Sequence, residues 1–362
     1  MKFFNVINEN MNKYIKKHIE DLERVRPEQD RINFLRLDMN ENPIGLPEDY
    51  FSNIISKITP ELIAMYPEPS HLINSLKKYL NVESENIMIT NGSDEAIKSI
   101  FEIFGADNKK MLAVYPSFEM YSVYSKMYNM KIDLVNYDED FSVDYLKICE
   151  KIDKDTAIIS LLNPNNPIGT VYKEEEVIEI IQKAKKNNAI VIIDEAYHYF
   201  YDKSFLYLVK EYDNVVILRT FSKLCSIAGL RIGYVVGSTK MINYLEKIRQ
   251  TFNVNSVGLY FAKSIIDDDY IIDYLIKSEK DGKDYLINSL RNNNYNYFYG
   301  NGNYVFIKPN RPIVDIVDDL KHNMILVKKY STPILADYIR ISTGDINSMS
   351  KFFKKFLELD NK

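Results

Sequence analysis

Short apolar runs alternate with amphipathic stretches along the first two thirds of the chain. Runs in which almost every position is apolar are typical of strands buried on both faces of a mostly parallel sheet. The stretches 95–104 and 174–186 carry apolar residues at helical spacing and predict helices that cover such a sheet. The pattern therefore predicts an α/β fold. The predicted strands are residues 87–90, 111–114, 157–162, 189–193, 215–218 and 231–236.

The pattern changes after about residue 270. Residues 303–308 and 338–342 predict strands flanked by helices, which indicates a second, smaller α+β domain. Near the other end of the chain, residues 13–24 predict an amphipathic helix. We therefore expect an N-terminal arm that joins the small domain, a large ligand-binding domain and a small C-terminal domain. Their predicted bounds are residues 1–45, 46–255 and 256–362, respectively.

Composition excludes several classes of protein. The net charge of -5 argues against a general nucleic-acid binder, which would carry a basic surface. The two cysteines, Cys149 and Cys225, have the spacing of neither a metal site nor a disulfide framework, and the four histidines are scattered. No run of about 18 apolar residues and no signal-peptide core occurs. We therefore expect a cytoplasmic protein without a metal, a nucleic acid or a membrane as partner.

Polar residues follow the predicted strands, at the edge where ligands bind in open α/β sheets. Lys223 follows one of these strands, and a lysine amine at a pocket can form a Schiff base with a carbonyl cofactor. Asp194 follows another and could keep a pyridinium nitrogen protonated, although capping a helix is the plainer alternative. Tyr197 could hydrogen-bond the phenolic oxygen of such a ring, or simply pack in the core.

A phosphate site is predicted from residues that lie far apart in the sequence. Ser93 and Asp94 stand where a strand passes into a helix, and helix N-termini bind anions. Thr220 and Ser222 supply hydroxyls, and the guanidinium of Arg231 matches phosphate geometry. Taken by itself, the segment that contains Ser93 and Asp94 is more simply interpreted as a helix cap.

Two further residues are candidates for contact with the cofactor ring. Asn166 lies in the turn-rich segment 163–169 and can point its amide at a ligand oxygen. Phe118 follows the predicted strand 111–114 and could stack flat on an aromatic ring, with a core position as the alternative.

The order of the motifs resembles that of fold-type I pyridoxal-phosphate (PLP) enzymes, and within them the histidinol-phosphate aminotransferase-like group of class I/II aminotransferases. The resemblance spans roughly residues 37–344, which is nearly the whole chain. The motifs are Asn40-Glu-Asn-Pro43, Tyr66-Pro-Glu-Pro69, Asn91-Gly-Ser-Asp-Glu95, Asn163-Pro-Asn-Asn-Pro-Ile-Gly169, Asp194-Glu-Ala-Tyr197, Ser222-Lys223, Gly229-Leu-Arg231 and Arg340-Ile-Ser-Thr-Gly344.

This resemblance implies a PLP-binding large domain, residues 46–255, and a role for each candidate. Lys223 would form the Schiff base with PLP and shuttle a proton, with Asp194 and Tyr197 as its catalytic partners. The implied cofactor-binding residues are Ser93, Asp94, Phe118, Asn166, Asp194, Tyr197, Thr220, Ser222, Lys223, Arg231 and Tyr66.

The resemblance also implies a dimer and a place for the substrate. Tyr66 would reach the cofactor phosphate from a neighbouring subunit, so a homodimer with shared active sites is expected. Arg340 would bind an anionic group of the substrate, and Asn42 and Lys328 would lie on the same side.

The chain departs from the group's pattern on the substrate side. Lys328 stands where an arginine is usual, and a lysine lacks the bidentate fork of an arginine. Met65 stands before the Tyr66 motif, where the group usually has an arginine. Arg24 and Arg26 either replace the lost positive charge or form a solvated basic turn, and we favour the turn. These departures leave the cofactor prediction in place but leave the substrate open.

We therefore predict an aminotransferase that acts on a small, phosphorylated amino or keto substrate, with glutamate as amino donor. The alternative is a PLP-dependent decarboxylase of an O-phospho amino acid, such as phosphoserine or phosphothreonine. A regulator built on the same fold is disfavoured, because too few residues precede the first motif for a DNA-binding domain. A nucleotide-binding Rossmann enzyme is disfavoured, because no Gly-x-Gly-x-x-Gly follows the first strand.

Overall fold

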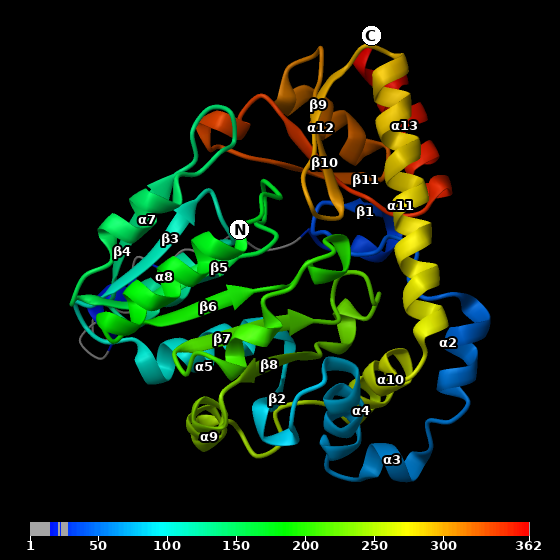
Figure 1. Ribbon diagram of the computed structural model, residues 1–362. Coiled ribbons are helices and arrows are strands. Elements are labelled where there is room, and N and C mark those ends of the chain that lie inside the picture. Colours follow the sequence, from blue (N-terminus) through cyan, green and yellow to red (C-terminus); the bar gives the residue numbers. More distant parts are fainter. Residues whose placement is uncertain (1–14, 21, 23–27, 362) are drawn as a thin grey trace.

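The larger of two β-sheets has seven strands (Figure 1). The computed structural model describes residues 15–20, 22 and 28–361. Strands β7, β6, β5, β3 and β4 run parallel to one another, whereas β8 runs antiparallel to both β7 and β2. In sheet order the strands are β2 (Ile87–Thr90), β8 (Gly233–Gly237), β7 (Val215–Thr220), β6 (Ile190–Asp194), β5 (Thr156–Leu162), β3 (Lys110–Tyr115) and β4 (Lys131–Asn136).

Helices cover both faces of the large sheet, because successive strand residues point to opposite sides and both sides are apolar. Within β6, for example, Val191 and Ile193 pack into one core and Ile192 into the other. The first core contains α4 (Ser70–Leu80), α7 (Tyr145–Lys151), α8 (Glu174–Lys186) and α10 (Ser256–Ile266). The second contains α5 (Gly92–Phe104), α6 (Glu119–Met127) and α9 (Thr239–Ile248).

The smaller sheet has five strands in the order β1 (Leu35–Leu37), β11 (Ile325–Lys329), β12 (Ile339–Ser342), β10 (Tyr304–Lys308) and β9 (Asn296–Phe298). Only the β1–β11 pair is parallel. Its core includes side chains from α11 (Asp269–Asn292), α12 (Ile313–His322) and α13 (Ile346–Asp360). The long helix α11 runs along one side of the molecule past both sheets (Figure 1).

The remaining helices are short. Among the described residues, the short α-helices are α1 (Lys17–Glu20), α2 (Glu48–Ile55) and α3 (Pro60–Ala64), which precede α4 in the sequence. The 3-10 helices are η2 (Arg31–Asn33), η3 (Ser84–Asn86), η4 (His198–Phe200), η5 (Leu206–Lys210), η6 (Ala228–Leu230) and η7 (Pro333–Leu335).

The predicted fold class is confirmed: a mostly parallel sheet lies between two helical layers, beside a smaller α+β unit. One strand of the large sheet, β4, was not predicted, because this edge strand is largely half-buried and forms no continuous apolar run. Of the predicted helix 13–24, the described part contains only α1, and the rest lies mainly outside the described residues.

The predicted domain bounds stay a prediction. Strand β1, in the predicted arm, pairs with β11 of the small sheet. Helix α10 and the first turns of α11 belong to the core of the large sheet, although they lie beyond the predicted boundary at residue 255.

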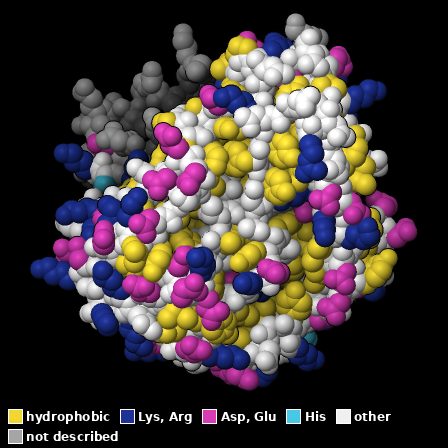
Figure 2. Space-filling view, turned by 45° about the horizontal axis from the view of Figure 1, so that its top comes forward, with side chains coloured by type: hydrophobic (Ala, Val, Ile, Leu, Met, Phe, Trp, Pro, Cys, Tyr) yellow, Lys and Arg dark blue, Asp and Glu magenta, His cyan; other side chains and the backbone are white. Residues whose placement is uncertain are grey.

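The surface carries charges of both signs. In the space-filling view, lysine and arginine side chains are interspersed with aspartate and glutamate side chains across the visible face (Figure 2). No helix in the described part of the chain has both the length and the apolar character needed to cross a membrane. Residues 15–20, 22 and 28–361 contain no group of three or more His, Cys, Asp or Glu side chains that could hold a metal ion. Cys149 and Cys225 are both free and buried.

Candidate active site

One cavity collects almost all of the predicted cofactor residues. It lies at the carboxyl ends of β5, β6 and β7 and holds about 760 Å³ of empty space. Strand register brings these ends together, because Asp194 is paired with both Leu162 and Leu218 across the sheet. The predicted residues that line the cavity are Ser93, Asp94, Phe118, Asn166, Asp194, Tyr197, Thr220, Ser222, Lys223 and Arg231.

Lys223 lies in the loop after β7, and its amine faces the cavity. Its Nζ donates a hydrogen bond to the backbone carbonyl of Met39 at 3.0 Å. Burial is the main cause that lowers the pKa of this amine to about 8, and the nearby positive charges of Arg340 and Arg231 act in the same direction. A pKa in this range leaves a substantial neutral fraction at neutral pH, and the neutral amine is the nucleophile.

Asp194 ends β6 and is buried, with 3% of its surface exposed. Its Oδ2 accepts a hydrogen bond from the hydroxyl of Tyr121 at 2.8 Å, and its Oδ1 accepts one from the backbone N–H of Ala196 at 3.0 Å. Burial raises the pKa of this carboxyl to about 6, against the opposing effect of these hydrogen bonds and of Lys223. Tyr121 is a site residue that the sequence analysis missed, because nothing in the spacing of α6 marks it.

Tyr197 is buried beside Asp194, and its hydroxyl accepts a hydrogen bond from Asn40 Nδ2 at 2.8 Å. Burial raises the pKa of this phenol to about 12, so the hydroxyl is neutral at physiological pH. Asn40 has a positive φ of 56° and is anchored by Ser342, whose hydroxyl accepts from the backbone N–H of Asn40 at 2.7 Å. Asn40 was part of a quoted motif, but its contact with Tyr197 was not foreseen.

Hydrogen bonds join three of the residues that are predicted to bind the phosphate, through their hydroxyl and guanidinium groups. Thr220 Oγ1 donates to Ser222 Oγ at 2.9 Å, and Arg231 Nη1 donates to the same Ser222 Oγ at 3.3 Å. Gly92, at the start of α5, has a φ of +70°, and a Cβ there would stand 2.4 Å from Arg231 Nη2. Glycine at this position therefore permits both the left-handed turn and the close approach of the guanidinium to the helix N-terminus.

Arg340 lies on β12 and borders the cavity through Asn166. Its Nη1 donates to Asn166 Oδ1 at 3.2 Å and to the hydroxyl of Tyr330 at 2.6 Å. Its Nη2 donates to the backbone carbonyl of Asp38 at 2.5 Å. The side chain is buried, and its Nε has no hydrogen-bond partner among the described residues. A buried, unsatisfied guanidinium N–H is an open donor for an anionic ligand.

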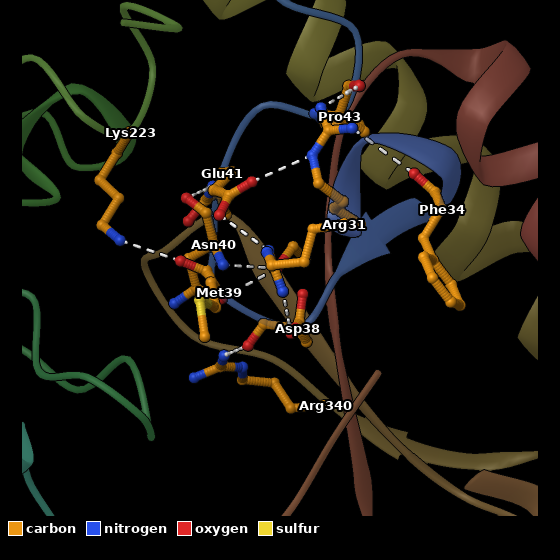
Figure 3. A network of polar contacts seen from close by, with 12 residues as sticks. Arg31, Phe34, Asp38, Met39, Asn40, Glu41, Pro43, Lys223 and Arg340 are labelled. Atoms are coloured by element: carbon orange, nitrogen blue, oxygen red, sulfur yellow. Dashed lines mark hydrogen bonds and ion pairs between the residues drawn. The ribbon is translucent and has the colours of Figure 1, made fainter. Parts of the chain in front are cut away.

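Residues 38–43, which we call the strap, lie between Lys223 and Arg340 (Figure 3). The strap accepts a hydrogen bond from each of these cations through a backbone carbonyl. Two arginines of the preceding segment hold its acidic side chains: Arg31 pairs with Asp38 at 2.5 Å and with Glu41 at 2.8 Å. The second oxygen of Glu41 accepts from Arg36 Nε at 3.1 Å. The charged network fixes the strap at the edge of the cavity.

A buried ion pair joins the chain after β6 to β7, next to Asp194. Glu195, next to Asp194, accepts from Arg219 Nε at 2.9 Å and Nη2 at 2.8 Å. Its other oxygen accepts from the backbone N–H of Phe205 at 2.7 Å, and Ser204 also donates to the carboxylate. Because Glu195 follows β6 and Arg219 lies in β7, the pair ties together the two strand ends that carry Asp194 and Lys223.

Besides Arg340, three predicted residues lie outside the cavity lining, and two lie outside the described residues. Tyr66 is 74% exposed and stacks on Phe252 with ring centroids 4.1 Å apart.

Asn42 lies in the strap, and its Nδ2 donates to Ser226 Oγ at 2.7 Å, in a small hollow that Lys223 also lines. Lys328 is half-buried on β11, directly opposite Arg340 in strand register. Arg24 and Arg26 lie outside the described residues.

The arrangement fits a phosphorylated pyridine aldehyde. An amine, a buried carboxylate and a phenol face the same cavity, with Phe118 on its wall. The hydroxyls of Thr220 and Ser222, the guanidinium of Arg231 and the N-terminus of α5 form a donor set suited to a phosphate. Each part of PLP therefore has a chemical counterpart in residues of this chain.

Comparisons with known proteins agree with this geometry. The family model "Aminotransferase class I and II" matches residues 32–356. The histidinol-phosphate aminotransferase of Clostridium novyi (strain NT) is 33% identical over 316 residues, which cover 86% of this chain and 87% of that protein.

Solved structures share the fold at lower identity. The histidinol-phosphate aminotransferase from Sinorhizobium meliloti in complex with pyridoxal-5'-phosphate has a TM-score of 0.85 at 21% identity and covers 96% of this chain and 97% of that chain. The L-threonine-O-3-phosphate decarboxylase from Porphyromonas gingivalis has a TM-score of 0.74 at 20% identity and covers 91% of this chain and 100% of that chain. At these identities the likeness shows the fold, which is the predicted PLP-dependent fold type I.

Proposed function

The chain belongs to the class I and II aminotransferases, and from this premise we propose that it exchanges an amino group between glutamate and a small phosphorylated substrate. The predicted family, cofactor and reaction type are confirmed: the protein is a PLP-dependent aminotransferase. PLP, when bound, supplies the electron sink that makes bonds at the substrate α-carbon labile. The residues of this chain bind that group, orient it and move protons.

We propose that Lys223 holds the cofactor covalently and later carries the proton at the substrate α-carbon. Its position between β7 and the strap supports this role, as does a pKa of about 8, which burial and Arg340 lower from the usual range. Asp194 would hold the pyridine nitrogen in its protonated form. Asn166 and Tyr197 would bind the phenolic oxygen, and Phe118 would pack on the ring.

For the cofactor phosphate, we propose Ser93, Asp94, Thr220, Ser222 and Arg231. The hydrogen bonds that join Thr220, Ser222 and Arg231 support this role. The first turn of α5, where Ser93 and Asp94 lie, adds backbone N–H groups at a positive helix end.

The substrate would lie beside Arg340, at the edge of the cavity that the strap borders. The open Nε donor of Arg340 suits a carboxylate or a phosphate. Lys328, opposite Arg340 on the neighbouring strand, places a second positive charge in the same region and supports a substrate with a phosphate group. Asn42 would complete this side from the strap. The relative from Clostridium novyi is a histidinol-phosphate aminotransferase, so histidinol phosphate is the first compound to test.

A homodimer is also part of this proposal. Tyr66 is far more exposed than is usual for an aromatic residue, and the surface around it includes the exposed apolar side chains of Ile63 and Met65. A second copy of the chain would cover this surface and bring its own Tyr66 toward the cofactor phosphate of the first. A reducing, cytoplasmic setting is proposed because both cysteines are free.

The proposal is tested by following the cofactor in a half-reaction. The purified holoenzyme would be mixed with glutamate, with histidinol phosphate or with unphosphorylated histidinol, and the conversion of the aldehyde band of PLP to the amine form would be recorded. We expect conversion with glutamate and with the phosphorylated amine, and much slower conversion with the unphosphorylated one. Absence of conversion with every amine would reject amino transfer.

The decarboxylase alternative is not favoured. The relative from Clostridium novyi, at 33% identity, is an aminotransferase, whereas the phosphothreonine decarboxylase shares the fold alone. Incubation with phosphothreonine and phosphoserine, with measurement of released carbon dioxide, separates the two reactions. Carbon dioxide release without formation of the amine form of the cofactor would reverse this ranking.

A further inference from the structure

Tyr121 makes a contact that the proposed roles do not use. We propose that Tyr121 is a positioning residue, whose hydroxyl keeps the Asp194 carboxylate ionised and correctly turned toward the ring nitrogen of PLP. The inference rests on the proposed role of Asp194. Tyr121 lies on α6, is 1% exposed and donates its hydroxyl hydrogen to Asp194 Oδ2 at 2.8 Å.

The hydrogen bonds to Asp194 fix the plane of its carboxylate. Oδ2 accepts from Tyr121, and Oδ1 accepts from the backbone N–H of Ala196 at 3.0 Å. A carboxylate oxygen has a second lone pair, so each oxygen can still accept a bond from a ligand. Because one donor comes from α6 and the other from the chain after β6, the carboxylate cannot rotate without breaking at least one bond.

The electrostatics of the site require such a donor. Burial raises the pKa of Asp194 to about 6, and the Tyr121 hydrogen bond is the largest of the effects that oppose this rise. Tyr121 itself remains neutral, because burial and the adjacent Asp194 raise its pKa far above the usual value. A neutral phenol remains a hydrogen-bond donor across the working pH range.

Tyr121 thereby influences whether one proton resides on the Asp194 carboxyl group or on the ring nitrogen of PLP. Asp194 and a pyridine ring nitrogen are bases of similar strength when the carboxyl pKa is near 6, so small changes decide which of them holds the proton. By donating to the carboxylate, Tyr121 lowers its basicity and leaves the proton on the ring nitrogen. A protonated ring withdraws electrons more strongly, which is the property that the proposed reaction needs.

The packing of Tyr121 allows the hydroxyl to be removed alone. Its ring lies near Phe101 and Phe118, each at a centroid distance of 6.4 Å. Tyr121→Phe keeps this ring and removes only the donor. Tyr172→Phe is the matched control, because Tyr172 is also buried and its hydroxyl has no hydrogen-bond partner among the described residues.

The test uses holoenzyme reconstituted with PLP labelled with 15N at the ring nitrogen. We expect the nitrogen resonance of the wild type and of Tyr172→Phe to be that of a protonated pyridinium at neutral pH. In Tyr121→Phe we expect the resonance to move toward that of a neutral pyridine. We also expect PLP to bind about tenfold more weakly, as for a change of about one pKa unit in the carboxyl group. Thermal unfolding of the cofactor-free proteins reports folding separately.

The outcomes separate the two proposals. A wild type that binds no PLP would remove the role of Asp194 itself. A wild type with a pyridinium resonance, together with an identical resonance in Tyr121→Phe, would overturn the role of Tyr121 and leave that of Asp194 intact. Equal displacement of the resonance in Tyr121→Phe and Tyr172→Phe would also overturn it, because the effect would then follow any buried hydroxyl.

Discussion

On the proposed cofactor side of the cavity, the carboxyl ends of neighbouring strands β6 and β7 and the loops that follow them supply Asp194, Tyr197 and Lys223. On the proposed substrate side, the groups come from the strap and from β11 and β12 of the other sheet, hundreds of residues apart in the sequence. The first side is stiffened by a buried ion pair between Glu195 and Arg219. The second is held by partly exposed pairs around Glu41.

This contrast indicates which substitutions each side of the cavity is expected to tolerate. Removing one partner of a buried pair is costly, on the order of 3–5 kcal/mol, so the cofactor side is expected to tolerate few substitutions. Exposed and partly exposed pairs contribute about 0–1 kcal/mol, so the substrate side can exchange charged residues at small cost in stability. Lys328, on β11, lies on that second side.

Lys223→Ala gives the largest expected effect and tests the cofactor side. Without the amine the cofactor has no covalent attachment and no group to carry the proton, so we expect kcat to fall on the order of 10⁴-fold or more, as when a covalent nucleophile is removed. The measurement is the steady-state rate together with the absorbance spectrum of reconstituted protein. Lys203→Ala, a surface lysine near η4, is the control. A mutant with the spectrum of the wild type would reject Lys223 as the attachment point.

Arg340→Gln tests the substrate side at its most buried point. Loss of a buried charged partner costs about 2–5 kcal/mol, so we expect kcat/KM for the anionic substrate to fall at least about 30-fold. Cofactor affinity should change little. Arg311→Gln is the control, since Arg311 pairs with Asp319 in the small α+β unit and not at the cavity. A loss confined to cofactor binding would show that Arg340 acts on the cofactor and not on the substrate.

The pH dependence of cofactor uptake links the two sides. Because the pKa of Lys223 is lowered to about 8, its neutral fraction reaches one half near pH 8 and is nearly complete about one to two pH units above that value. The rate of PLP incorporation into cofactor-free protein should therefore rise about tenfold per pH unit below the pKa and then level off. In Arg340→Gln the plateau should move to higher pH, because Arg340 is the largest charge effect that lowers this pKa. A wild-type rate that still climbs steeply beyond pH 10 would contradict the lowered pKa.

Lys328→Ala gives the smallest expected effect. A half-buried cation contributes about 1 kcal/mol, so we expect KM for a phosphorylated substrate to rise roughly fivefold with kcat nearly unchanged. Lys328→Arg should restore or improve binding, because the fork of arginine matches phosphate. Lys329→Ala, at the more exposed neighbouring position, is the control. An equal effect on an unphosphorylated substrate would exclude contact with the phosphate.

The same contrast explains what the sequence could predict. Lys223 and Asp194 lie in short motifs at or just after the carboxyl ends of parallel strands, so their gathering followed from the rule for parallel sheets. Tyr121 lies within a helix whose spacing gives no signal, and its contact with Asp194 depends on the packing of α6 against the sheet. Asn40 meets Tyr197 from 157 positions away, a distance that no local pattern encodes. Strand β4 was missed because an edge strand need not be apolar on both faces.

The strap engages Lys223 and Arg340 through the carbonyl oxygens of Met39 and Asp38, groups that every amino acid carries. Exchange of either side chain leaves the acceptor where it is, provided that the chain follows the same path. An insertion or deletion of one residue within 38–43 would instead displace both acceptors together. The two carbonyl contacts therefore depend on the length of this segment, whereas side chains such as Asn40 and Glu41 hold the segment in position.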